Sequence, residues 1–279
     1  MMLPNGLKWN EAELEPLHPI NDLLISILAF DDDLGPHPIG TGFIVAALGE
    51  LAVGCSAAHN FREIDRIQRP YRLHHPSALA EFLPDSQPLD LDRKRIRALH
   101  TSTGRVDLAV FGWVVWNEKT DIAFFLDTSV PPKDTEVVVL GYQDMAIENE
   151  FRNGPDHGSF QVRERLLMRG GRITDVHMDG FRLCKGPAVE TSIPVFPGMS
   201  GGPVMRLGKA GEPMRPFGLI SSDPYEGSTE KMDRSIGGSS IVSLIQTPFR
   251  LSDQDGKEKL LRLDGGFWAV NRDEMDDQA

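Results

Sequence analysis

Short runs of β-type residues, separated by turn signals, constrain the fold of this chain more than any other feature. Such runs recur at spacings of 8 to 15 residues in both halves of the chain, from 22–30 to 238–245. Turns containing Gly, Pro, Asn or Asp separate them, and no stretch has a long helical periodicity. Short strands at this spacing favour a sandwich or a barrel. The sequence therefore predicts an all-β protein.

The chain divides most naturally at residues 128–135, which contain Pro131-Pro132 and have the character of a linker. We expect one β unit at 17–130, a second at 131–250 and a polar C-terminal tail at 251–279. Residues 64–92 contain several prolines and no clear strand pattern. They are interpreted as a long insertion that covers or shapes a cleft.

Composition excludes several classes of function. The hydrophobic content of 40% and charged content of 25% are typical of a soluble globular protein. A net charge of −12 argues against a nucleic-acid partner. No apolar run approaches the ~18 residues of a membrane span, so no membrane association is expected. No secretory signal is recognised at the N-terminus, and a cytoplasmic location is predicted.

The cysteines and histidines give no sign of a disulfide framework or a metal site. A secreted, bridged domain would be expected to have more cysteines than Cys55 and Cys184, and each is expected to be a buried free thiol. The adjacent His74 and His75 diverge on any regular element and have no cysteine nearby. No metal and no cofactor are predicted.

Ser200 stands in the most distinctive short segment, Pro197-Gly198-Met199-Ser200-Gly201-Gly202-Pro203-Val204. Glycines permit positive φ values and the close approach of a second backbone. A serine on such a loop is accessible, and neighbouring N–H groups can converge on one point, as a serine nucleophile requires. The alternative is a tight Gly-Pro turn with an incidental serine.

His59 follows the apolar run 51–56, so it is rigidly placed and can still reach a cleft. Taken alone, it could equally be a structural histidine at a strand end. Two aspartates, Asp107 and Asp121, each open an apolar run and could serve as its partner. A serine nucleophile needs a base and an acid, and His59 with one of these aspartates could supply them.

Together these segments resemble the trypsin-like (chymotrypsin-fold) serine proteases, in a bacterial-type branch. The resemblance covers about residues 20–248. The segments that carry it are Gly40-Thr41-Gly42-Phe43, Ser56-Ala57-Ala58-His59, Thr120-Asp121-Ile122-Ala123, Gly198-Met199-Ser200-Gly201-Gly202-Pro203 and Gly218-Leu219-Ile220-Ser221.

The resemblance implies two antiparallel six-stranded barrels, with a loop or helix insertion in the first and the catalytic residues between them. It implies a serine endopeptidase in which Ser200 is the nucleophile, His59 the general base and Asp121 the acid that orients the imidazole. The N–H groups of Gly198 and Ser200 would form the oxyanion hole. Ser221 would brace the aspartate, and Ser221, Ser222 and Asp223 would contact a protein or peptide substrate.

Asp121 is preferred to Asp107 because it opens a short apolar run just before the proline-containing seam, as the family pattern suggests. Asp107 lies in Val106-Asp107-Leu108-Ala109, which also fits that pattern, so the choice stays open.

The sequence departs from the digestive enzymes at two positions. Met199 replaces the family's usual aspartate, so activation by a freshly cut N-terminal amine is not available, and Asn60 replaces the cysteine that usually follows the histidine. Both departures resemble branches of the family that fold active and are controlled in other ways. Control by a regulatory protein partner, the insertion or the tail is therefore expected. A catalytically silent binding or scaffold module of the same fold is the main alternative. An esterase is disfavoured because no helix pattern follows Ser200.

Overall fold

The computed structural model describes most of the two halves of the chain. The residues described are 9–15, 18–30, 36–48, 51–65, 69–73, 98–102, 106–114, 123–152, 158–181, 184–208, 213–222, 239–245, 249–252, 258–264 and 267–270. Within these residues, no helix is long and apolar enough to cross a bilayer.

The C-terminal half is a closed antiparallel barrel. Its strands follow the order β8-β9-β10-β13-β12-β11, and β11 pairs back with β8. The strands are β8 (Glu136–Arg152), β9 (Gly158–His177), β10 (Ala188–Thr191), β11 (Pro203–Arg206), β12 (Pro216–Ser222) and β13 (Ser240–Leu244). The six-stranded barrel predicted for this half is confirmed.

The valine-rich start of β8 shows why this barrel packs against the other half. Val137 and Val139 lie in one core cluster with Val204 of β11, whereas Val138 and Leu140 lie in another with Phe43. Successive side chains of a strand point to opposite faces, so the start of β8, at residues 137–142, buries both of its faces. The second cluster includes residues of both halves and holds the halves together.

The N-terminal half forms an antiparallel sheet with the order β6-β7-β4-β3-β2-β5. Its strands are β2 (Leu24–Phe30), β3 (Pro36–Leu48), β4 (Leu51–Ser56), β5 (Arg69–Leu73), β6 (Ala98–Ser102) and β7 (Ala109–Val114). The all-β class and the six antiparallel strands expected for this half are confirmed. Between its end strands β5 and β6, however, the described residues show no pairing that would close the sheet.

The C-terminal segment differs from the polar tail expected at 251–279. β14 (Phe249–Ser252), β15 (Glu258–Asp264) and β16 (Phe267–Val270) form an antiparallel extension that joins the first sheet at β6. An unpaired strand edge offers free N–H and C=O groups to another strand. β14 pairs with β6 at this edge of the sheet. Leucines and charged residues alternate along 261–264, a strand pattern that the high average polarity conceals.

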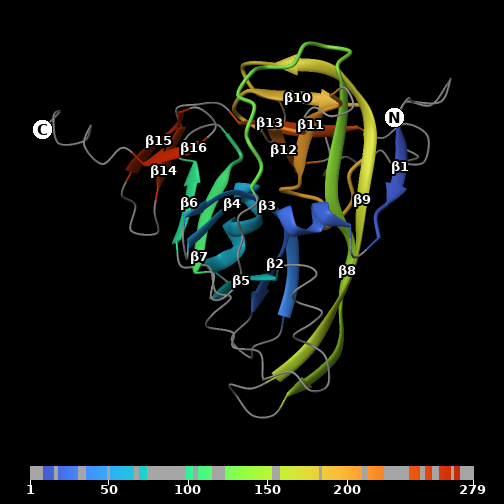
Figure 1. The fold of residues 1–279 in the computed structure, drawn as a ribbon, viewed down its shortest axis with the longest axis vertical. Coiled ribbons are helices and arrows are strands. Elements are labelled where there is room, and N and C mark those ends of the chain that lie inside the picture. The colour runs from blue at the N-terminus through green and yellow to red at the C-terminus, as the bar shows by residue number, and fades with distance from the viewer. Residues whose placement is uncertain are drawn as a thin grey trace, which may run out of the picture.

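The N-terminal segment crosses to the opposite half of the molecule. β1 (Asn10–Glu13) pairs antiparallel with β9, from Asn10 opposite Gly170 to Glu13 opposite Leu167. The short 3₁₀ helix η1 (Pro19–Leu23) then leads into β2 of the first sheet. Figure 1 shows β1 beside β9, with the C-terminal strands on the far side of the molecule. Residues 10–13 therefore pair with the second barrel.

Two further expectations concern the core and the insertion. Cys55 and Cys184 are buried free thiols, as expected. Of the predicted insertion at 64–92, only residues 64–65 and 69–73 are described; the remainder, with His74 and His75, lies outside the described residues.

Candidate active site

His59 and Asp107 form the central contact of the site. The Nδ1 atom of His59 lies 2.6 Å from Oδ2 of Asp107, and the backbone N–H of His59 donates to Oδ1 at 2.9 Å. The pairing of β4 with β7 explains this contact, because Ser56 is opposite Ala109. The strands are antiparallel, so the residues after Ser56 run beside those before Ala109. His59 lies in the 3₁₀ helix η2 (Ala58–Asp65), directly after β4.

Asp107 is 5% exposed and is held as a carboxylate by its neighbours. Ser221 Oγ on β12 donates to Oδ2 at 2.7 Å, and the Asp107 N–H donates to Ser243 Oγ at 3.1 Å. Burial alone would raise the pKa of Asp107. The hydrogen bond and charge of His59, together with the Ser221 hydroxyl, outweigh burial and keep the pKa below its ordinary value. The His59 side chain, by contrast, is 33% exposed and accessible to a reactant.

This contact changes the choice between the two aspartates. The role predicted for Asp121, accepting the His59 Nδ1 hydrogen bond, is filled by Asp107, while Asp121 lies outside the described residues. The family pattern alone could not separate the two, because both precede an apolar run. The strand expected after Asp121 is also absent from the described residues that follow it, since 123–135 contain no strand.

Two consecutive turns shape the segment around Ser200. The Met199 N–H donates to the Phe196 carbonyl at 3.1 Å, across Pro197 and Gly198, whose φ is +95°. Proline second and a positive-φ residue third define a type II turn. A second turn follows at once, in which the Gly202 N–H donates to the Met199 carbonyl at 3.0 Å. Its third residue again has a positive φ.

That third residue, Gly201, can only be glycine. Its φ is +87°, and a Cβ atom added there would lie 2.1 Å from Ser56 Oγ and 2.2 Å from the Thr41 carbonyl oxygen. No side chain fits at these distances, so the glycine allows the loop to lie directly against the first sheet.

Thr41 and Asn60 anchor the loop to the first half of the chain. The Thr41 hydroxyl donates to the Gly198 carbonyl at 2.7 Å, and the Thr41 N–H donates to the Ser200 carbonyl at 2.9 Å. The Asn60 side-chain amide donates to the same Ser200 carbonyl at 3.0 Å. Asn60 directly follows His59, so these contacts bring the backbone of Ser200 to the element that carries His59.

Two N–H groups of this loop are left available. Within the described residues, neither the Gly198 N–H nor the Ser200 N–H donates a hydrogen bond to another protein atom. In a trans peptide the C=O and N–H point in opposite directions. Because the Met199 carbonyl is turned towards Gly202, the Ser200 N–H is turned away from that turn. Free donors beside a half-buried serine are suited to stabilising an oxyanion.

The three residues predicted to contact a substrate lie in different surroundings, and one of them is not among the described residues. Ser221 donates to the carboxylate of the buried aspartate, as predicted, but that aspartate is Asp107. Ser222 ends β12 opposite Ile241. Asp223 lies outside the described residues. In the described part of the chain, no group of three His, Cys, Asp or Glu side chains could hold a metal ion.

Sequence reasoning missed two residues that hold the loop. Thr41 stands in the Gly40-Thr41-Gly42-Phe43 segment, where the flanking glycines indicate a close backbone approach. Arg169 is an arginine within a strand and gave no signal of its own. It is nevertheless buried, and it donates to the Pro194 carbonyl at 2.9 Å and to Met199 Sδ at 3.1 Å.

Comparison with known proteins adds little to these contacts. No protein-family model matches this chain, and no curated protein matches it. Among solved structures, the chain is similar to the crystal structure of Rv3671c from M. tuberculosis H37Rv, an inactive serine-to-alanine mutant. The two share 15% sequence identity over 80% of this chain and 82% of that chain, with a TM-score of 0.43. We draw no conclusion about the reaction from this likeness.

Proposed function

We propose that this protein is a serine endopeptidase that uses Ser200, His59 and Asp107. The observation that carries the proposal is the set of contacts on Asp107. This buried carboxylate accepts hydrogen bonds from the ring and the backbone N–H of His59 and from the Ser221 hydroxyl. These contacts hold the imidazole in one tautomer. The turn geometry of the Ser200 segment supports the same reaction.

In the proposed reaction the Ser200 hydroxyl attacks the carbonyl carbon of a peptide bond. His59 accepts the hydroxyl proton at Nε2 and then gives it to the leaving amine, so an acyl-enzyme remains on Ser200. A water molecule then attacks the acyl carbon with His59 again as the base. Its proton returns through His59 to Ser200 Oγ as the acid product leaves.

Asp107 acts through His59. By accepting the Nδ1–H bond it leaves Nε2 with its lone pair free, and its negative charge stabilises the imidazolium formed during each step. The carboxylate itself stays ionised, in keeping with its lowered pKa.

The oxyanion of each tetrahedral intermediate is assigned to the N–H groups of Gly198 and Ser200. Fixed backbone donors of this kind contribute roughly 3–4 kcal/mol each to the stabilisation of the transition state. The turns and the Thr41 hydrogen bonds fix these peptides before a substrate binds. The donors therefore need no reorganisation during the reaction.

A fluorophosphonate probe tests the proposal directly. The wild-type protein should be labelled and Ser200→Ala should not, with the adduct mapped to the Ser200 peptide by mass spectrometry. Ser129→Ala is the matched control, because among the described residues the Ser129 hydroxyl bonds to Asp127 and Arg206 and to no residue of the site. It should be labelled like the wild type. A folded wild type that stays unlabelled would refute the proposal and favour the silent binding module.

Labelling alone does not separate an endopeptidase from an esterase. Digestion of a denatured protein, followed by identification of the new termini, should give internal cleavage products that are absent with Ser200→Ala. Hydrolysis of activated esters without any peptide cleavage would contradict the endopeptidase assignment.

A further inference from the structure

Arg169 on β9 is a buried cation directly beneath the Ser200 loop. Its side chain is 2% exposed, and all three guanidinium nitrogens have partners. Nε donates to Glu11 Oε2 at 2.7 Å, and Nη2 also lies 2.7 Å from that oxygen. Nη2 donates to Gln143 Oε1 at 2.7 Å, while Nη1 contacts Pro194 and Met199 as described above.

Aromatic rings complete the surroundings of this guanidinium. Its carbon atom lies 4.4 Å from the centroid of the Phe196 ring and 5.5 Å from that of Trp9. Guanidinium is more weakly hydrated than ammonium and stacks well on aromatic faces, which suits it to such a position. Trp9 and Glu11 come from the N-terminal segment, and Phe196 comes from the loop.

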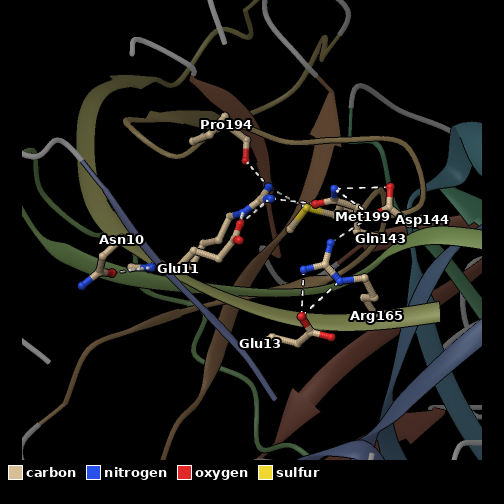
Figure 2. A network of polar contacts seen from close by, with 10 residues as sticks. Asn10, Glu11, Glu13, Gln143, Asp144, Arg165, Pro194 and Met199 are labelled. Atoms are coloured by element: carbon tan, nitrogen blue, oxygen red, sulfur yellow. Dashed lines mark hydrogen bonds and ion pairs between the residues drawn. The ribbon is translucent and has the colours of Figure 1, made fainter. Parts of the chain in front are cut away.

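The network therefore connects the N-terminal strand to the loop that carries the candidate nucleophile. Figure 2 shows Glu11, Pro194 and Met199 converging from different elements, and the pair of Glu13 and Arg165, which is joined to this network through Asp144 and Gln143. Met199 directly precedes Ser200, and its carbonyl closes the turn that orients the Ser200 N–H. A displacement of Met199 would move this peptide.

We propose that Glu11 and Arg169 are positioning residues for the reaction, and that docking of β1 through Glu11 holds the Ser200 loop in its competent arrangement. This inference rests on the proposed function. A buried cation is stable only while its counter-charge is present. Without the Glu11 carboxylate, the guanidinium is drawn towards water and releases the Pro194 carbonyl and the Met199 sulfur. The oxyanion donors then lose their fixed orientation, while His59 and Asp107 stay in place.

β1 supplies its own matched control. Glu13 also pairs with an arginine of β9, since its Oε2 lies 2.8 Å from Arg165 Nη2. That pair is exposed, and its hydrogen bonds connect to Arg169 through Asp144 and Gln143 rather than directly. Glu11→Gln and Glu13→Gln thus remove the same charge from the same strand, and only the first removes a direct partner of Arg169.

The experiment measures kcat, KM, the rate of fluorophosphonate labelling and the thermal midpoint of the full-length variants. Glu11→Gln should lower kcat and the labelling rate about tenfold or more, with KM within about twofold of wild type. Glu13→Gln should match the wild type in kcat, KM and the labelling rate. Acrylamide quenching of Trp9 fluorescence, taken as the difference from a Trp9→Phe background, should increase in Glu11→Gln only.

Equal labelling rates for wild type, Glu11→Gln and Glu13→Gln would overturn the positioning role while leaving the proposed function intact. An unlabelled wild type would overturn both. If Glu11→Gln fails to fold, the double variant Glu11→Gln with Arg169→Met removes both charges and keeps an apolar filling. The proposal then expects the same loss of kcat in a folded protein, and a wild-type kcat in that variant would overturn it.

Discussion

Replacing Asp107 by asparagine is the sharpest test of the site. The substitution keeps size and shape, but it replaces one carboxylate oxygen by an NH₂ group. The asparagine oxygen can still accept the His59 N–H, which places the NH₂ group towards His59 Nδ1, where Oδ2 now lies at 2.6 Å. A donor at that position requires Nδ1 to be an acceptor, so the ring proton moves to Nε2 and the imidazole can no longer act as the base.

The expected loss of kcat is about 10⁴-fold, equivalent to ~5.4 kcal/mol at ~1.36 kcal/mol for each factor of ten. Steady-state hydrolysis of a peptide substrate at neutral pH measures it. Asp127→Asn is the control, since Asp127 pairs with Arg206 at 3.2 Å away from these contacts, and it should keep full activity. Asp121→Asn should also retain most activity. A loss of less than tenfold in Asp107→Asn, or a large loss in Asp121→Asn, would refute the assignment of the acid.

The pH dependence of the free energy of unfolding tests the lowered pKa of the Asp107 carboxylate independently. The pKa of Asp107 is lower in the folded protein than its ordinary value of 3.8, so its ionised form stabilises the fold above that pH. This contribution is lost as the pH falls through the lower, folded value. Wild type should therefore be more stable than Asp107→Asn at pH 7, and the difference should shrink below about pH 3.8, as urea unfolding would show.

Three further substitutions test the supports of the site. Thr41→Val removes the hydroxyl that donates to the Gly198 carbonyl, so kcat should fall about tenfold. Urea unfolding should show that the free energy of unfolding falls by about 1–3 kcal/mol. An unchanged kcat would contradict the role of this hydroxyl. Gly201→Ala would combine a φ of +87° with a Cβ atom 2.1 Å from Ser56 Oγ. Calorimetry should show that the free energy of unfolding falls by roughly 2–6 kcal/mol. A decrease below about 1 kcal/mol would contradict the close packing of the loop. Burial raises the pKa of Glu164 to about 7, although the Ser26 hydroxyl opposes this, so the folded state binds its proton more tightly than the unfolded state. Wild-type stability should fall as the pH rises from about 4.5 to 7, and Glu164→Gln should reduce that fall by roughly 1–3 kcal/mol; parallel curves for the two proteins would contradict the raised pKa.

The turns around Ser200 and the strands of both halves can be predicted from the sequence alone. The positions of Gly198 and Gly201 around Ser200 specify two turns, because only glycine adopts their φ values without strain. The alternation of β-type runs with turn residues likewise specifies strands, since it sets which side chains face a core. These features depend on neighbouring residues only, so they can be recognised without a structure.

The tertiary structure decides which residues, distant in the chain, contact His59 and Arg169. Asp107 and Asp121 look alike in sequence, and only the register of β4 with β7 brings Asp107 to His59. Arg169 shows the same limit, because an arginine in a strand is ordinarily exposed. Its burial depends on Glu11, which is 158 residues away in the chain and becomes a neighbour only when β1 pairs with β9. Contacts of this kind arise from strand register and packing, which a local pattern does not contain.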